Sequence, residues 1–377
     1  MEAPFEDDEH EPSFRFYDNR QKYLMFVTTC SEKWEISRHV GRELKKIQPR
    51  PPALRIFDAG VGDGTVLANV LRHAHRLFPT VPILTVGKEI SMEDVRLALE
   101  KLPDRLAEHP QSVFVLTNMT YGEAPQLCPD GGHHQVNWID VALEGASTHE
   151  FEAQIQTLET RLGHGWAVES GGSGLLRYVR PSVITVYRAD QAFALDTVIP
   201  RFGDAPGPFD LIITSQPYRA RASVAFKTRA ILAPLVKALA TGGRLVAIQS
   251  RGGDPGAELI GRIWPDRILF PHDRHAILNS LKVELGSETR YFRFSAFSDR
   301  QSLFRYDLHM LPSEVGGRVG TSTLFAAWNA ATYVAQIEDS LIEGAMHRPD
   351  IMDITRDVLR RYEGMWFLDE SFVVVRR

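Results

Sequence analysis

The sequence predicts an α/β protein with a doubly wound, mostly parallel sheet, an inserted α+β subdomain and an N-terminal helical segment. Strand-like apolar runs alternate with amphipathic helical runs along most of the chain, which is typical of a parallel sheet covered by helices on both faces. The alternation is interrupted once, from about residue 121 to 208. The order β-α-β-α-β, then β-α-β, therefore indicates a doubly wound fold with one interruption.

The individual elements follow from local patterns. Ser31 is a helix cap for an apolar stripe that contains Ile36, Val40 and Leu44, and "QPRPP" ends that helix. The core strands are expected in "LRIF", "VPILTVGKEIS", "SVFVLTN", "FDLIIT" and "GGRLVAIQ", with helices between them. The interruption contains strand-like "WIDVAL" and "PSVITVYR" around an amphipathic helix. We expect the last strands in "RYFRFSAF" and "STLFAAW", then a helix at 351–362 and a terminal "SFVVVRR".

These elements suggest five segments. Residues 1–50 form an N-terminal helical cap, 51–120 and 209–335 the two halves of the core, 121–208 the inserted subdomain, and 336–377 a C-terminal helix and strand.

Composition limits the class of protein. The chain has 377 residues, of which 44% are hydrophobic, so it can bury a large core. No run approaches the roughly 20 apolar residues of a membrane helix, and the acidic start "MEAPFEDDEHEPSF" is unlike a signal peptide. We therefore expect a cytoplasmic protein without a membrane partner. The net charge of −5 gives no overall attraction to nucleic acid.

No metal or disulfide is expected. Cys30 and Cys128 are far apart and lack the spacing of a zinc site or a disulfide framework. The histidine pairs His133–His134 and His272–His275 lack a further ligand at metal spacing.

A glycine-rich turn carries the strongest functional signal. In "LRIFDAGVGDGTVLANVL", Asp58, Gly60, Gly62 and Gly64 join the end of a strand to the start of a helix, where a nucleotide-like ligand could approach the backbone closely. An NAD-binding turn would need a third glycine where this chain has Thr65 or Leu67, depending on the register. A nicotinamide-dependent oxidoreductase is therefore the weakest of the alternatives.

The stretch "FDAGVGDGT" resembles motif I of class I S-adenosylmethionine-dependent methyltransferases. The resemblance implies that the backbone from Gly60 to Gly64 passes under the methionine and ribose of S-adenosylmethionine and that Asp58 anchors its amino group. It also implies that Glu89, after the second strand, accepts hydrogen bonds from the ribose hydroxyls. Asn118 and Met119, after the third strand, would bracket the adenine.

The acceptor side is expected at the end of the fourth strand, since ligands of open α/β sheets bind at the carboxyl ends of strands. There "ITSQPYRA" resembles a signature of amino-methyltransferases, in which Asp, Asn or Ser precedes Pro-Pro and then Tyr or Phe. By that resemblance Ser215 would accept a hydrogen bond from a target nitrogen and Tyr218 would stack on a planar acceptor. Gln216 replaces the first proline, so a strand-to-loop turn with a buried tyrosine remains an equal possibility.

Three alternatives for function stay open besides a methyltransferase for small molecules. A nucleic-acid amino-methyltransferase is the first, because basic residues are interleaved with aromatic ones at Arg177, Arg180, Arg188, Arg219, Arg221, Lys227 and Arg229. A non-catalytic binding or assembly module with the same fold is the second, and the oxidoreductase is the third. The sequence contains no signal for the oligomeric state.

Overall fold

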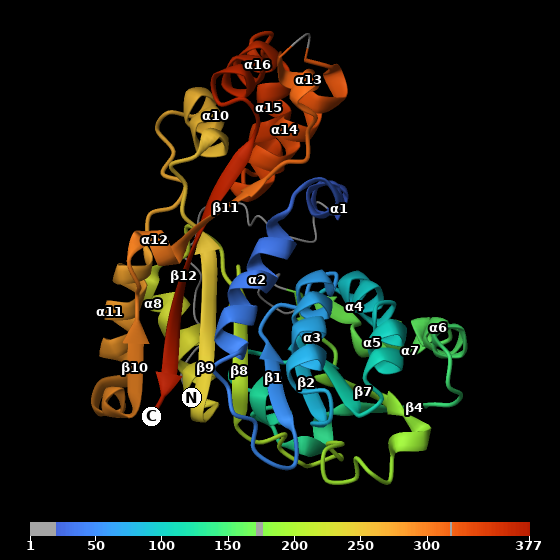
Figure 1. Cartoon of the computed structure of the whole chain (residues 1–377). Coiled ribbons are helices and arrows are strands. Elements are labelled where there is room, and N and C mark those ends of the chain that lie inside the picture. Colours follow the sequence, from blue (N-terminus) through green and yellow to red (C-terminus); the bar gives the residue numbers. More distant parts are fainter. Residues whose placement is uncertain (1–19, 171–175, 317–318) are drawn as a thin grey trace. The chain divides into compact units, whose positions relative to one another are not determined.

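The computed structural model describes residues 20–170, 176–316 and 319–377 (Figure 1). Its contacts divide the chain into two compact units. The larger unit consists of Lys33–Gln249, His272–Phe304 and Glu370–Arg377. The smaller unit contains the described residues up to Glu32, together with Ser250–Pro271 and Arg305–Asp369.

The larger unit is built on the predicted doubly wound sheet. Strands β1 (Leu54–Asp58), β2 (Ile83–Lys88), β3 (Ser112–Thr117), β8 (Phe209–Ser215) and β9 (Leu239–Ser250) lie in the order β3-β2-β1-β8-β9. All four neighbouring pairs are parallel. The order reverses between β1 and β8, as in doubly wound folds. Next to β9 lies β12 (Trp366–Arg376), and β10 (Phe292–Ser295) pairs with it antiparallel.

The interrupting residues extend this sheet. Strand β7 (Ser182–Arg188) pairs antiparallel with β3, and β4 (Asn137–Leu143) pairs parallel with β7. Both strands were predicted from the sequence. Helices α6 (Thr148–Gln156) and α7 (Glu159–Gly165) and the short pair β5 (Val168–Ser170) and β6 (Leu176–Tyr178) complete the insertion.

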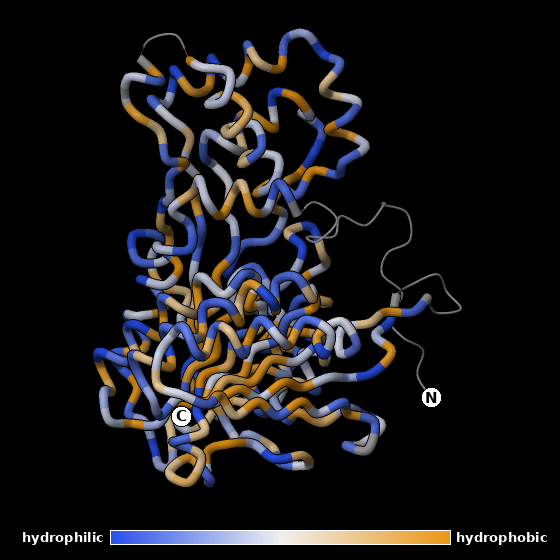
Figure 2. The backbone as a smooth tube through the Cα atoms, turned by 90° about the vertical axis from the view of Figure 1, so that its right-hand side faces the viewer, coloured by the Kyte–Doolittle hydropathy of each residue, from blue (hydrophilic) through white to orange (hydrophobic). Residues whose placement is uncertain are grey.

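Apolar side chains on the two faces of the sheet pack into two separate cores. Along β1, for example, Ile56 belongs to one core and Phe57 to the other, as the alternation of a strand requires. Figure 2 shows hydrophobic residues concentrated along the central strands. The first core contains residues of α2 (Glu32–Leu44), α3 (Thr65–Leu77), α4 (Met92–Leu99) and α5 (Leu102–Glu108). The second contains residues of the π-helix η5 (Lys227–Leu232), α9 (Ala233–Lys237) and α11 (Arg274–Leu285), and α8 (Val224–Phe226) packs beside it.

The smaller unit is mainly helical. It contains α1 (Arg20–Thr29), α10 (Pro255–Ile263), α13 (Pro312–Gly316), α14 (Thr321–Val334), α15 (Asp339–Met346) and α16 (Ile351–Arg361), and β11 (Leu303–Asp307) pairs with β12. Short turns elsewhere are η2 (Ala124–Gln126), η3 (His133–Gln135), η4 (Ala189–Gln191), η6 (Gly286–Tyr291) and α12 (Asp299–Ser302). Within the residues described, no helix is both long and apolar enough to cross a membrane.

Two sequence-based expectations differ from this arrangement. The strand expected at "STLFAAW" is wrong, because these residues lie in α14. The run is rich in alanine, a strong helix former, and lacks the alternation of a half-buried strand. The expected segment 1–50 is also divided: α1 lies in the smaller unit, where Lys22 pairs with Asp339 of α15 at 2.6 Å, whereas α2 from Lys33 onward belongs to the larger unit.

Candidate functional site

The candidate site lies at the carboxyl ends of β1, β2 and β8, where the strand order reverses and doubly wound folds bind ligands. Strand β1 ends at Asp58, β2 is followed by Glu89, and β8 ends at Ser215. These strands are adjacent in the sheet (Figure 1). The predicted cofactor side and the predicted acceptor side are therefore brought to one edge.

The glycine turn contains one glycine needed for packing and one that faces open space. Gly64 has a φ of 81°, and a Cβ at this position would lie 2.8 Å from the Cα of Ala98 in α4. Gly64 therefore allows α3 and α4 to approach closely. A Cβ on Gly60 would meet nothing within 4 Å. The backbone at Gly60 is thus accessible to a ligand.

Asp58 has an oxygen without a hydrogen-bond partner. Its side chain is 1% exposed, and Oδ1 accepts a hydrogen bond from the Gly60 amide at 3.2 Å. Oδ2 is buried and has no partner among the described residues. Burial, with a contribution from the nearby Glu89, raises the pKa of Asp58 to about 7. The Gly60 amide and the charge of Lys33 lower this pKa less than burial raises it, so the carboxylate is short of hydrogen-bond donors.

Glu89 is held against the glycine turn by backbone amides. Its Oε2 accepts from the Gly62 amide at 2.7 Å, and its Oε1 accepts from the amides of Ile90 and Ser91 at 2.7 and 2.9 Å. The structure thus brings Glu89 and the glycine turn together, and the ribose contact expected for Glu89 stays a prediction. Oε2 has a further lone pair for a ligand hydroxyl, since a carboxylate has about four acceptor positions.

Other acids add negative charge around the turn. Asp63 is paired with Lys101 at 3.3 Å. In Asp94, burial together with Glu89 and Asp63 raises the pKa to about 7. Burial is the largest cause of both raised pKa values, those of Asp58 and Asp94, and neighbouring acids add to it, so a cationic ligand would favour the ionised form of both carboxylates.

Asn118 and Met119 have structural contacts. The Asn118 amide donates to the carbonyls of Gly165 and Arg180 at 3.0 and 3.3 Å, and its oxygen accepts from the Ser182 amide at 2.8 Å. Met119 is 2% exposed and packs in the second core. The contacts of Asn118 thus join the end of β3 to the insertion, a role that the sequence did not indicate. The contact expected between Asn118 and adenine stays a prediction.

Ile90 is a residue of this edge that the sequence analysis missed. It follows Glu89 directly, and its apolar side chain is 41% exposed beside the carboxylate. An apolar residue directly after the strand-end acid was the available signal. Such a side chain can cover one face of a planar ring.

The loop after β8 differs from the proline-containing signature that it resembles. Gln216 has a φ of 50°, and its amide donates to the Ile248 carbonyl at 3.0 Å. Proline is fixed near −65° and has no amide hydrogen, so it could not occupy this position in this conformation. Ser215 is partly exposed at the end of β8, but the Pro-Pro geometry assumed for its role is absent here.

Tyr218 is a buried residue of the second core. It is 5% exposed, its hydroxyl donates to Gln249 Oε1 at 2.9 Å, and Lys227 Nζ lies 4.8 Å from the centre of its ring. Burial raises its pKa above the ordinary value for tyrosine. Lys227 thus covers one face of this buried ring, and the stacking role expected for Tyr218 stays a prediction.

Tyr121 and Lys88 also lie at this edge and were not predicted. The Tyr121 hydroxyl donates to the Pro217 carbonyl at 2.7 Å and so joins the loop after β3 to the loop after β8. Lys88 Nζ lies 4.5 Å from the centre of the Tyr121 ring, and burial lowers the pKa of Lys88 to about 8. No sequence motif distinguishes either residue.

The predicted basic stripe is not one free surface. Arg188 pairs with Asp190 at 2.6 Å, Arg229 pairs with Glu284 at 3.3 Å, and Lys227 is buried. Within the described ranges, no group of three histidine, cysteine or acidic side chains could hold a metal ion.

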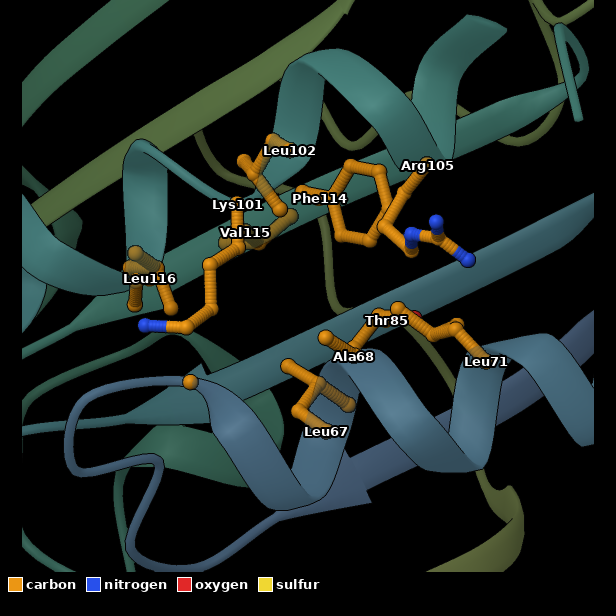
Figure 3. Close-up of a pocket in the computed structure, with 12 residues that line it drawn as sticks. Leu67, Ala68, Leu71, Thr85, Lys101, Leu102, Arg105, Phe114, Val115 and Leu116 are labelled. Carbon is orange, nitrogen blue, oxygen red and sulfur yellow. The ribbon is translucent and has the colours of Figure 1, made fainter. Parts of the chain in front are cut away.

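A small cavity lies next to the glycine turn, between α3, β3 and α5 (Figure 3). Its volume is about 10 Å³, and Leu67 and Leu71 of α3 face Leu102 and Phe114 across it. This space is large enough for about one water molecule and not for a nucleotide. It is a packing defect next to the glycine turn and not the candidate site.

Comparisons with known proteins found similarity to solved structures only. No family model matches the sequence, and no curated protein matches it. A geranyl diphosphate methyltransferase, solved with GPP and sinefungin, is 13% identical with a TM-score of 0.32, and the match covers 90% of this chain and 78% of that one. A phosphoethanolamine N-methyltransferase 2 from Haemonchus contortus, solved with S-adenosylhomocysteine, is 11% identical with a TM-score of 0.33, covering 97% and 60%.

A third similar structure, the cyclase SpnF, is 11% identical with a TM-score of 0.32, and the match covers 90% of this chain and 81% of that one. All three TM-scores are below 0.5, so these similarities carry no argument about activity. The sheet order and strand directions of the chain itself identify it as an α/β protein with a doubly wound, mostly parallel sheet.

Proposed function

We propose that the larger unit binds S-adenosylmethionine and that the protein is an S-adenosylmethionine-dependent methyltransferase for a small-molecule acceptor. One observation carries the proposal: Asp58 Oδ2 is buried without a partner beside the open face of Gly60. A buried carboxylate oxygen of this kind fits an ammonium donor. The amino-acid end of S-adenosylmethionine has such an ammonium.

The charges of the site favour this cofactor over a dinucleotide. S-adenosylmethionine carries a sulfonium as well as the ammonium, and both would offset the negative charge of Asp58, Glu89 and Asp94. A pyrophosphate would add negative charge to a site in which burial and neighbouring acids already raise the pKa of Asp58 and Asp94 to about 7. The absence of the third dinucleotide glycine supports the same choice.

The remaining residues take roles that their positions allow. The backbone at Gly60 would face the methionine end, Glu89 would accept from ribose hydroxyls, and Ile90 would cover the adenine. When bound, S-adenosylmethionine supplies an electrophilic methyl group. The protein's part is then to orient the cofactor and an acceptor near Ser215 and to exclude water, and we assign no general base.

The loop after β8 favours one alternative function. Because Tyr218 is buried and Gln216 cannot be replaced by proline in this backbone, the planar amino acceptor implied by the signature loses support. A non-catalytic module that binds S-adenosylmethionine would be consistent with this loop. Binding without methyl transfer to any acceptor would favour it. A cytoplasmic location remains a prediction.

Calorimetric titration with S-adenosylmethionine, S-adenosylhomocysteine and NADH tests the proposal. We expect binding of the first two, weakened at least tenfold in Asp58→Ala and Glu89→Ala, since each removes a charge-assisted hydrogen bond of about 1.5–3 kcal/mol. Asp210→Asn is the matched control. Asp210 is a buried carboxylate at the amino end of β8 that accepts from the Arg55 amide at 2.9 Å, far along the strand from Ser215. No binding of S-adenosylhomocysteine by the folded wild-type protein would refute the proposal.

A further inference from the structure

The loop formed by Glu89, Ile90 and Ser91 is fixed on both sides. On one side, the Glu89 carboxylate accepts from the amides of Ile90 and Ser91. On the other side, the indole N–H of Trp166 donates to the Glu89 carbonyl at 2.8 Å, and the Tyr178 hydroxyl donates to the Ile90 carbonyl. Trp166 and Tyr178 both belong to the insertion at 121–208.

We propose that Trp166 and Tyr178 are positioning residues for Glu89, so that the insertion sets the affinity for the adenosine part of the cofactor. The inference rests on the proposed function, because it assigns Glu89 to the ribose. It gives the insertion a role at the cofactor, whereas its sequence contains no motif for one.

The planarity of the peptide explains how these bonds act on the carboxylate. In a trans peptide the C=O and the following N–H point in opposite directions in one plane. Trp166 therefore holds one end of the Glu89–Ile90 peptide, and Glu89 Oε1 binds the other end. Tyr178 and Oε1 hold the Ile90–Ser91 peptide in the same way. If either donor is lost, that peptide can rotate and Glu89 loses a fixed partner.

The insertion is itself fastened next to Trp166. The Gly165 carbonyl, which directly precedes Trp166, accepts from Asn118 Nδ2 at 3.0 Å and from Ser182 Oγ at 2.7 Å. Asn118 follows β3 and Ser182 begins β7, so the end of α7 is tied to two strands of the sheet. Trp166 is buried, and its position relative to Glu89 is therefore well defined.

A matched pair of tyrosine variants tests the proposal. Tyr178→Phe removes the hydroxyl that binds the Ile90 carbonyl. Tyr187→Phe removes a hydroxyl of the same insertion that donates to Asp140 at 3.0 Å, away from the loop. We expect Tyr178→Phe to weaken binding of S-adenosylhomocysteine and of 5′-methylthioadenosine by the same factor, roughly threefold to tenfold, and Tyr187→Phe to leave both unchanged. Trp166→Phe should act like Tyr178→Phe.

Comparison with 5′-methylthioadenosine separates a loss at the adenosine end of the ligand from a loss at its amino-acid end. Asp58→Ala should weaken S-adenosylhomocysteine and not 5′-methylthioadenosine, which lacks the amino-acid end. Hydrogen exchange without any ligand gives a second readout, and we expect the amides of Ile90 and Ser91 to exchange faster in Tyr178→Phe than in Tyr187→Phe.

Each outcome has one meaning. If the wild-type protein binds neither ligand, the proposed function fails and this inference fails with it. If it binds both and Tyr178→Phe and Trp166→Phe bind them as tightly as the wild-type protein, the positioning role alone is refuted. Faster exchange together with equal loss for both ligands would support it.

Discussion

Replacing Asp58 by asparagine should stabilise the protein without its cofactor, and the gain should depend on pH. The pKa of Asp58 is raised from 3.8 in the unfolded chain to about 7 in the folded protein. Between these values the folded state binds more protons than the unfolded state, so wild-type stability falls as the pH rises. Above pH 7 the loss reaches about 4 kcal/mol, at about 1.36 kcal/mol per pH unit. Asp58→Asn removes this loss.

The stability gain of Asp58→Asn is reduced by a cost that does not depend on pH. Asparagine would keep the bond from the Gly60 amide, but its amide donors would be buried where Oδ2 now lacks a partner, at a cost of about 1–3 kcal/mol. The free energy of unfolding of Asp58→Asn minus that of the wild-type protein should therefore increase by about 2.5 kcal/mol when the pH is raised from about 5 to about 8. Urea unfolding of both proteins at several pH values measures this difference.

The same variant should lose cofactor affinity, because a neutral amide is a weaker partner for an ammonium group. A stabilised protein that binds poorly would show that the buried carboxylate is retained for binding at the expense of stability. The reasoning is refuted if the difference in unfolding free energy between Asp58→Asn and the wild-type protein stays constant from about pH 5 to about pH 8, since the raised pKa would then be absent.

Three further predictions concern the same edge of the sheet. Affinity for S-adenosylhomocysteine should weaken up to about tenfold per pH unit as the pH falls below 7, because the ammonium requires ionised Asp58. Calorimetric titration over that pH range measures the affinity, and an affinity that does not change with pH would contradict the prediction. Gly64→Ala should lower the melting temperature strongly, because its Cβ would lie 2.8 Å from the Ala98 Cα. Gly60→Ala should keep the melting temperature and weaken cofactor binding, because a Cβ there would meet nothing within 4 Å. Equal melting temperatures for the two variants would contradict this prediction. Gln216→Pro should destabilise the protein by about 3 kcal/mol or more and Gln216→Gly should not, as measured by thermal unfolding, because position 216 has a φ of 50°. Similar unfolding of these two variants would count against the left-handed loop.

The positions of the residues expected on the cofactor side could be predicted from the sequence because their signals are local. Asp58 ends a strand that an apolar run identifies, the three glycines and Glu89 follow such strands, and parallel strands place their carboxyl ends at one edge. The two strands of the insertion were predicted for the same reason. Their pairing with β3 could not be, since it depends on contacts between residues far apart in the sequence.

The acceptor side was predicted less well, and the reason is tertiary. The burial of Tyr218 depends on Gln249 and Lys227, which come from other elements. The left-handed backbone of Gln216 is rare for a residue other than glycine, so no sequence rule predicts it. The strand expected at "STLFAAW" rested on a short apolar run, whose length alone does not distinguish a strand from a buried helix, and the alanine content of Thr321–Val334 favours the helix.

The pairing of β1 with β8 has a consequence for folding. Ile56 lies opposite Leu211 in this pair, so the chain must complete the whole insertion before the two strands can meet. Closing so long a loop costs conformational entropy and slows folding. Strands β1, β2 and β3 can associate earlier, and β7 then covers the open edge of β3, which would otherwise be free to pair with another chain. Strand β7 thus pairs with an edge of β3 that is available before β8 has been made, and β4 becomes the edge strand on that side of the sheet.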